Sequence, residues 1–267
     1  METTLSINQP IENTKLRRLQ QHLALMLAEF DEYCAQHGIK YTLEGGTALG
    51  AFRHQGFIPW DDDIDIRMDI VEYKKFCKAM SKESPRYLRL QNHETDSLYM
   101  NGFAKLRDTR TVFKEQNVKI EYAENGCFID IFPFENAFPL LTAIYHLMHK
   151  PLFMLNHYPL HRHPVIHKMA CMYFSFCKSM ASVFRCISKV LRCKDYSYGY
   201  GSNIYTFKWR YREDIFAETI YLKFEDQEYP APGKIEEYLS IHYGEKYMEL
   251  PPMEKRVAHH VDEIIGI

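Results

Sequence analysis

The chain has 267 residues, of which 46% are hydrophobic, and its formal net charge is −2. That length and apolar content predict a globular protein of one or two domains and exclude a disordered chain. Acidic and basic residues nearly balance, so the protein lacks the overall positive field that nucleic-acid binding requires, and we expect no nucleic-acid partner.

We expect neither an export signal nor a membrane-spanning segment. The first twenty residues carry charge throughout, which is not typical of a signal peptide. Apolar stretches end well short of the roughly 20 residues that a spanning helix needs. The seven cysteines are odd in number and include no C-x-x-C pair, a usage typical of reduced cytoplasmic thiols. We therefore expect a cytoplasmic protein, with peripheral contact to the inner face of the cell membrane left open.

The first predicted elements are a helix and a strand. Apolar side chains recur at three- and four-residue spacing over residues 11–37, and Gly38 ends the pattern, as expected of a helix closed by a glycine. Residues 39–44 alternate and favour β-structure, which predicts a strand. This strand runs directly into Gly45 and Gly46.

The next elements continue this alternation of helices and strands. A short helix is expected over residues 47–54, with Thr47 as its N-cap. Residues 63–68 alternate polar and apolar side chains, which predicts a strand, and the periodicity of residues 70–80 predicts a helix. Further strands are expected near residues 87–90, 103–106 and 127–132.

The composition changes from Pro133 onward, where the chain becomes aromatic, rich in histidine and helical in pattern. We therefore expect an α+β fold, with a small mixed β-sheet flanked by helices and a mainly helical C-terminal half. A soft boundary separates residues 1–134 from residues 135–267, and a single domain stays open.

Four aspartates fall within five residues, namely Asp61, Asp62, Asp63 and Asp65. Carboxylates this close repel one another by roughly 4 kcal/mol per pair at an effective dielectric near 20, and a divalent cation would relieve the repulsion. Side chains two apart in a strand share a face, so Asp63 and Asp65 would point the same way. Asp130 would join them if its strand pairs beside theirs. We expect these three to hold one or two Mg²⁺ (or Mn²⁺) ions, with Asp61 as a further candidate ligand.

A glycine turn precedes the aspartates and adds a second feature. Gly45, Gly46 and Thr47 connect a predicted strand to a predicted helix. Glycines allow backbone amides to approach a ligand closely, and a helix N-terminus favours an anion. Together with the aspartates, the turn predicts a metal-dependent phosphoryl-transfer site.

Two other interpretations of the acidic cluster are an EF-hand calcium loop and a solvated acidic loop. Asp61, Asp63, Asp65 and Glu72 occupy positions 1, 3, 5 and 12 of an EF-hand calcium loop, but Ile66 stands where that loop needs glycine. A solvated acidic loop would leave the alternate isoleucines exposed to water.

The two blocks LEGGTALG and RHQGFIPWDDDIDI, residues 43–50 and 53–66, resemble the LicD family of phosphocholine transferases. Later blocks that fit the same family occur at residues 105–111 and 128–133, and at Phe224-Glu225, Tyr243-Gly244 and Pro251-Pro252.

The resemblance implies a nucleotidyltransferase-like catalytic core in residues 1–134 and a C-terminal region that completes the acceptor site. It also implies transfer of phosphocholine from CDP-choline to a hydroxyl of a bacterial cell-surface glycan, of the lipopolysaccharide or teichoic acid type, or its precursor. By this resemblance Asp63, Asp65 and Asp130 are the catalytic residues. Two alternatives stay open, namely transfer of another activated alcohol phosphate or nucleotide, and a non-catalytic cation- or glycan-binding module.

Further side chains are candidates for binding the donor. Arg53, Lys105 and Arg107 could neutralise its diphosphate, arginine in a bidentate manner. A quaternary ammonium cannot donate a hydrogen bond, so choline would need an aromatic face, and Trp60 and Trp209 are the first candidates. Surface charge and core packing are the alternative explanations of these residues.

Residues 165–192 form a basic amphipathic helix in pattern, with one apolar stripe that includes Met169, Met172 and Phe176. Such a helix either rests on an anionic membrane or packs on the rest of the protein. In the same region a zinc site is a minor alternative, with candidate ligands His157, His161, His167 and Cys171.

Overall fold

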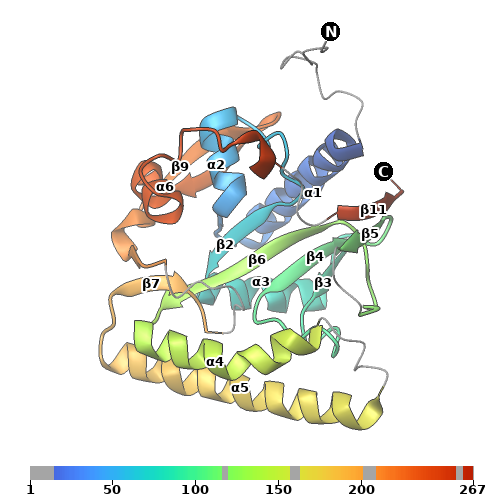
Figure 1. Cartoon of the computed structure of the whole chain (residues 1–267), viewed down its shortest axis with the longest axis vertical. Coiled ribbons are helices and arrows are strands. Elements are labelled where there is room, and N and C mark those ends of the chain that lie inside the picture. The colour runs from blue at the N-terminus through green and yellow to red at the C-terminus, as the bar shows by residue number, and fades with distance from the viewer. Residues whose placement is uncertain (1–14, 116–119, 157–162, 201–208, 257–260, 267) are drawn as a thin grey trace.

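The computed structural model describes residues 15–115, 120–156, 163–200, 209–256 and 261–266. Helices and strands alternate through the first half of the chain, and two long helices follow the longest strand (Figure 1). The helices are α1 (Lys15–His37), α2 (Gly45–His54), α3 (Ile70–Lys82), α4 (Pro139–Asn156), α5 (Pro164–Val190) and α6 (Ile235–Tyr243), with short 3-10 turns at Glu213–Ile215 and Met253–Lys255. The strands are β1 (Thr42–Leu43), β2 (Asp65–Asp69), β3 (Leu88–Gln91), β4 (Ala104–Asp108), β5 (Val112–Glu115), β6 (Phe128–Asn136), β7 (Asp195–Tyr198), β8 (Tyr211–Arg212), β9 (Thr219–Phe224), β10 (Gln227–Pro232) and β11 (Val261–Ile265).

A mixed sheet lies at the centre, as the sequence predicted. Its strands follow the order β1-β2-β6-β4-β3, and β7 and β8 extend it beside the end of β6. Strands β2 and β6 run parallel, whereas every other pair in this sheet is antiparallel. Two strand pairs lie outside the sheet, β9 with β10 and β5 with β11.

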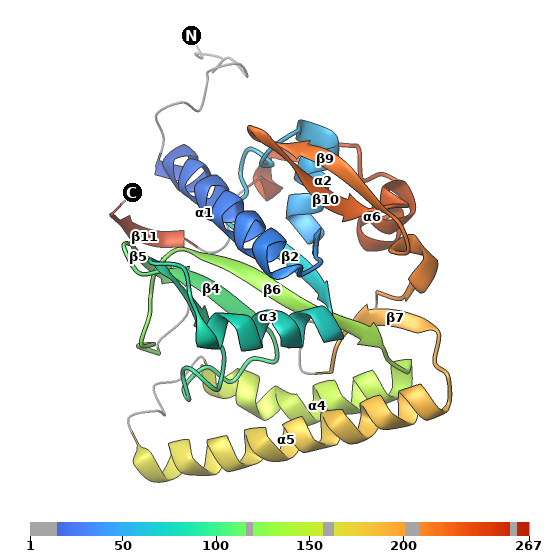
Figure 2. The same cartoon turned by 180° about the vertical axis from the view of Figure 1, so that it is seen from behind.

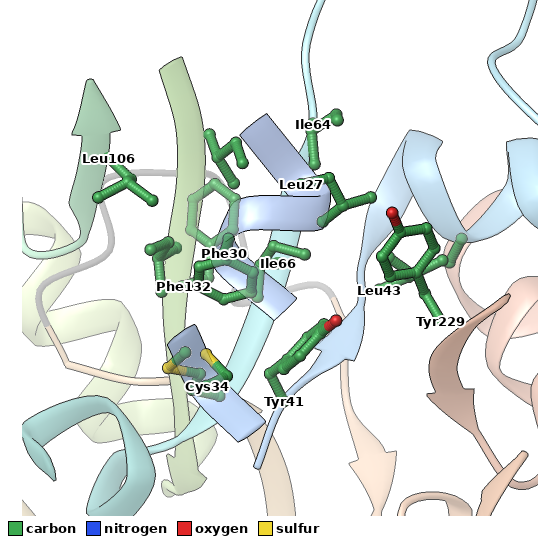
Figure 3. Packing of buried hydrophobic residues seen from close by; sticks show 14 of the residues in the cluster. Leu27, Phe30, Cys34, Tyr41, Leu43, Ile64, Ile66, Leu106, Phe132 and Tyr229 are labelled. Atoms are coloured by element: carbon green, nitrogen blue, oxygen red, sulfur yellow. The ribbon is translucent and has the colours of Figure 1, made fainter. Parts of the chain in front are cut away.

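One face of the sheet is apolar and is covered by α1 and α3, which lie in front of the strands in Figure 2. Leu27, Phe30 and Cys34 of α1 are buried against a cluster that includes Ile64 and Ile66 (Figure 3). Because side chains alternate along a strand, the opposite face takes Asp65 and Arg67 of β2, Lys105 and Arg107 of β4, and Asp130 of β6.

Helices α4 and α5 pair as a hairpin that forms one outer edge of the molecule in both views. The hairpin has its own small core, in which Tyr145 of α4 meets Phe174 and Cys177 of α5. Within the described ranges, no helix is both long and apolar enough to cross a membrane.

The prediction of a mainly helical C-terminal half is correct for α4 and α5 and wrong beyond them. Strands β7 and β8 rejoin the central sheet, and β9 and β10 form a hairpin before the short helix α6. The boundary drawn between residues 134 and 135 falls inside β6, and the division into two units stays a prediction.

Local predictions were close, with corrections at the ends of elements. Of the strand predicted over residues 39–44, only Thr42–Leu43 forms a strand. The strand predicted over residues 63–68 begins at Asp65. Helix α2 begins at Gly45 with Glu44 as its N-cap residue, so the N-cap role predicted for Thr47 is wrong. Residues 11–14 of the first predicted helix lie outside the described residues.

Candidate active site

Two parallel strands place Asp65 and Asp130 side by side. In the register of β2 and β6 the two residues are direct partners, and the backbone N–H of Asp130 donates to the carbonyl of Ile64 at 2.9 Å. Paired residues on adjacent strands project from the same face. The pairing on which the predicted convergence of these carboxylates depended is therefore present.

The other aspartates lie in the loop that leads into β2. Asp61, Asp62 and Asp63 can each bring a carboxylate oxygen within 4.8 Å of the other two, close enough to share one cation. The side chain of Gln20 holds this loop by donating to the backbone carbonyl of Asp61 at 2.9 Å. Asp63 thus lies in the loop and not in the strand, and Asp62 joins Asp61 among the further candidate ligands.

The pKa of Asp65 shows how strongly these carboxylates interact. Burial raises this pKa well above its usual value, and the negative charges of Asp63, Asp130 and Asp61 raise it further. A bound cation would reverse this effect by favouring the ionised form. The donor set, made only of carboxylate oxygens, suits Mg²⁺ or Mn²⁺.

The glycine turn packs directly against these carboxylates. Gly45 has φ +49°, a left-handed conformation, and a Cβ at this position would lie 3.0 Å from Oδ2 of Asp65. A Cβ on Gly46 would lie 2.8 Å from Oδ2 of Asp61. The N-terminus of α2 therefore meets the acidic cluster without any intervening side chain, as a site for a phosphate bridged to a metal requires.

Thr47 ties the turn to β2. Its hydroxyl oxygen accepts a hydrogen bond from the backbone N–H of Asp65 at 2.9 Å. Thr47, which belongs to the turn of the predicted phosphoryl-transfer site, thus helps to position Asp65, a candidate metal ligand.

Lys105 supplies a positive charge next to Asp130. The two residues are register partners on β4 and β6, and the distance from Nζ to Oδ1 is 3.1 Å. Both side chains are buried, and Nζ also lies 3.2 Å from the centre of the Phe128 ring. Of the three cations proposed for the diphosphate, this one has a direct contact with the carboxylate site.

The two arginines have other contacts. Arg107 is buried and donates to Oε1 of Gln91 at 2.7 Å and to the carbonyl of Gly126 at 2.9 Å. Arg53 lies in the last turn of α2 and donates to the carbonyl oxygens of Tyr247 and Glu249. Their predicted contact with the donor diphosphate stays a prediction.

The two tryptophans are both partly buried. The guanidinium of Arg256 lies 5.3 Å from the centre of the Trp60 ring. Trp209 stacks on His242 at 4.1 Å and donates its indole N–H to the carbonyl of the same residue. A role for either ring in choline binding stays a prediction.

Sequence reasoning missed a buried polar network under the glycine turn. Oε1 of Glu44 accepts hydrogen bonds from the hydroxyls of Tyr198 at 2.7 Å and Tyr238 at 2.6 Å. The Tyr238 hydroxyl also accepts from the backbone N–H of Gly45 at 2.8 Å. Burial raises the pKa of Glu44 to about 7, although both tyrosine hydrogen bonds act to lower it.

Tyr243, which the sequence placed in a family block without a role at the site, also lies beside the glycine turn. Its hydroxyl would lie 3.8 Å from a Cβ on Gly45. Burial raises the pKa of this hydroxyl well above its usual value, and the charges of Asp65 and Asp61 raise it further. Helix α6, which ends at Tyr243, therefore brings the C-terminal part of the chain to the site.

The structure gives different outcomes for the EF-hand and the zinc interpretations. The EF-hand interpretation is wrong, because Asp65 begins a strand and Glu72 lies on α3, where its Oε2 accepts from the backbone N–H of Lys40. For zinc, Nε2 of His167 lies 3.3 Å from Sγ of Cys171, whereas His157 and His161 lie outside the described residues.

Comparison with known proteins provides a family match. Residues 38–173 match the model described as LicD/FKTN/FKRP, nucleotidyltransferase domain. The chain is 29% identical over 267 residues to the lipopolysaccharide cholinephosphotransferase LicD of Haemophilus influenzae, which covers 92% of this chain and 96% of that protein. A stretch of 29 residues, 11% of this chain and 6% of the relative, is 59% identical to the human ribitol 5-phosphate transferase FKRP. An uncharacterized protein of Rickettsia prowazekii is 46% identical over 59 residues, 21% of this chain and 22% of that protein.

Proposed function

The chain belongs to the LicD/FKTN/FKRP family of nucleotidyltransferase domains, and on that premise we propose that it transfers phosphocholine from CDP-choline to a hydroxyl of a lipopolysaccharide-type glycan. Family membership and the Haemophilus relative make it a phosphotransferase. The observation that carries the finer proposal is the close approach of the glycine turn to the carboxylates of Asp61 and Asp65, since a glycine turn suits a phosphate and a group of carboxylates suits a divalent cation.

The residues present fit a divalent metal. Asp61, Asp62, Asp63, Asp65 and Asp130 offer oxygen ligands only, and burial together with the negative charges of its neighbours raises the pKa of Asp65. Mg²⁺ held by some of these groups would neutralise charge on the transferred phosphate.

Backbone amides and side chains of the protein would bind the donor and position the reacting groups. The backbone amides at the start of α2, at Gly46 and Thr47, would bind phosphate oxygens of the donor. Lys105 would hold the carboxylate of Asp130 in place through their ion pair. Asp130 would either complete the metal site or accept the proton of the acceptor hydroxyl.

The transfer step balances as a substitution at phosphorus. The acceptor oxygen forms a bond to the phosphorus of phosphocholine while the bond from that phosphorus to the bridging oxygen breaks. CMP leaves, and the hydroxyl proton passes to a carboxylate. Catalysis then consists mainly of positioning and charge neutralisation.

We propose the cytoplasm, at the inner face of the cell membrane, as the place of action. All seven cysteines are free thiols in the structure, which supports a reducing compartment.

A second candidate donor is an activated ribitol phosphate, which the short match to the ribitol 5-phosphate transferase favours. A thermal-shift experiment with CDP-choline, CDP-ribitol and CTP, each with and without Mg²⁺, separates the candidates. We expect CDP-choline with Mg²⁺ to raise the unfolding midpoint most. A larger shift with CDP-ribitol would transfer the proposal to that donor, and the absence of any nucleotide response would favour a non-catalytic binding module.

A further inference from the structure

The hairpin of α4 and α5 exposes a continuous apolar stripe. On α5 the exposed apolar residues follow one another at spacings of four, three, four, seven and seven positions, which place them on one face of the helix. Small side chains, among them Ala170, Cys177 and Ala181, form the buried face of the same helix. The stripe residues are 45% to 73% exposed, and they are Val165, Met169, Met172, Phe176, Val183 and Val190.

Helix α4 contributes an adjoining stripe. Leu140, Ile144 and Leu147 are all exposed at heptad-like spacing, the first and last at 71%. The Tyr173 hydroxyl of α5 donates to the carbonyl of Met148 in α4 at 2.7 Å, so the exposed faces of the two helices meet. Soluble monomers rarely leave an apolar surface of this extent without a binding partner.

The charge of this region points to the kind of partner. From residue 136 to residue 194 the chain contains no aspartate or glutamate. Two of its cations pair with acids from other elements, Lys178 with Glu94 and Arg185 with Glu135. The region nevertheless keeps an excess of positive charge, because its eight basic residues are Lys150, Arg162, Lys168, Lys178, Arg185, Lys189, Arg192 and Lys194.

We propose that the α4–α5 hairpin lies flat on an anionic phospholipid surface, with the apolar stripe between the head groups and the surrounding cations against lipid phosphates. A second copy of the chain fits this face poorly. A two-fold dimer would place the same patch against itself, bringing cations onto cations with no acid from this region to pair them.

This inference deepens the proposed function and rests on it, because it supplies a reason for the acceptor to be attached to lipid. Strand β6 runs from Asp130 to its end at Asn136, and α4 begins three residues later. Six residues of strand span roughly 20 Å. The three residues to Pro139 add about 10 Å and the thickness of a helix about 10 Å more. The carboxylate site would therefore stand within about 40 Å of the membrane, within reach of sugars on a lipid anchored in the same bilayer.

Co-sedimentation of the full-length protein with vesicles tests the surface directly. We expect binding to vesicles of phosphatidylglycerol and phosphatidylcholine, weakening as salt is raised, and at least tenfold less binding to phosphatidylcholine alone. The double variant Met172→Glu, Phe176→Glu should lose at least tenfold in binding to the anionic vesicles. The matched control is Leu25→Glu on α1, because Leu25 is 66% exposed, as Met172 is, and it should bind like the parent protein.

Equal binding to both vesicle types, or unchanged binding of the double variant, would overturn the proposal. So would a dimer in sedimentation velocity that the double variant splits, because the stripe would then belong to a second copy. The vesicle assay contains no nucleotide, so its failure leaves the proposed reaction untouched. Conversely, the double variant should keep the thermal shift with CDP-choline and Mg²⁺, which separates loss of the surface from loss of the site.

Discussion

The central sheet and the α4–α5 hairpin distribute their side chains in opposite ways. On the polar face of the sheet, Lys105, Arg107 and Asp130 are between 1% and 7% exposed. On the hairpin, Leu147 and Met172 are 71% and 66% exposed. One region buries charge and the other exposes apolar surface.

Both arrangements reduce the stability of the isolated fold. A buried charge must be paired to offset its desolvation, and each large apolar side chain left in water forgoes about 1.5–3 kcal/mol of burial free energy. The sheet compensates internally, through contacts such as that of Lys105 with Asp130. The hairpin has no such internal compensation in the described part of the chain, which is why we look for its partner outside the protein.

The largest expected effect comes from Asp65→Asn. Loss of this carboxylate should lower the transfer rate about 1,000-fold, or about 4 kcal/mol in the activation barrier. In a chelator the same variant should unfold at a higher temperature than the parent, because one negative charge leaves a repelling cluster. Full activity would refute the assignment of Asp65, and a lower unfolding temperature in chelator would refute the account of its pKa.

Arg107→Met tests whether the buried charges of the sheet are needed for stability. The substitution leaves Oε1 of Gln91 and the carbonyl of Gly126 without their buried donor. The free energy of unfolding in urea should fall by about 3 kcal/mol.

The matched control for that variant is Arg212→Met, which removes an exposed arginine paired with Asp214. Its effect on the free energy of unfolding should be much smaller than that of Arg107→Met, because solvent screens an exposed ion pair. Equal effects of the two variants would mean that burial of Arg107 contributes nothing.

The third effect is on pH dependence and comes from Glu44. Its pKa is about 7 in the folded protein, against an ordinary 4.5, so the folded state binds the extra proton. Folding stability should therefore fall as pH rises from about 4.5 to about 7, by roughly 3 kcal/mol in total. Glu44→Gln should remove most of this slope in urea unfolding measured across that range.

Glu225 provides a control of opposite sign. Burial alone would raise its pKa, but the ion pair with Arg17 holds the pKa below its usual value. Its contribution to stability is therefore present above the unfolded pKa and should be lost as pH falls. If Glu225→Gln flattened the slope near pH 7 as Glu44→Gln does, the slope would not arise from Glu44.

The smallest expected effect is on the hairpin itself. Met172→Glu should change the free energy of unfolding by no more than about 0.5 kcal/mol, because the side chain is exposed. Phe174→Ala, two residues further along α5 at a buried position, should cost about 3–5 kcal/mol. Similar losses for the two variants in urea unfolding would show that the stripe is buried in the free protein.

The sequence predicted those helices and strands whose residues show a regular apolar pattern along the chain. Helices α1 and α3 follow from apolar spacing, and β6 follows from the apolar run around Asp130. The sequence leaves open whether β2 pairs with β6, and the register of Asp65 with Asp130 shows that the two strands do pair.

The features that the sequence did not predict are those that leave no regular pattern in neighbouring residues. Strand β10 contains two prolines, which remove backbone donors and argue against a strand. The Met172 stripe was compatible with either a buried or an exposed face, because periodicity shows only that a helix has two faces. The network around Glu44 joins residues 154 and 194 positions apart, a separation that no spacing rule covers.

The hydrogen bond from the Gly45 amide to the Tyr238 hydroxyl also affects when activity can arise during protein synthesis. The two residues are 193 positions apart, so the glycine turn cannot be fixed by this contact until nearly the whole chain has left the ribosome. A nascent chain or a product truncated before α6 would contain all the aspartates of the candidate site but would lack Tyr238, which holds the glycine turn. If the turn binds the donor as proposed, unfinished copies of the enzyme would not consume that donor.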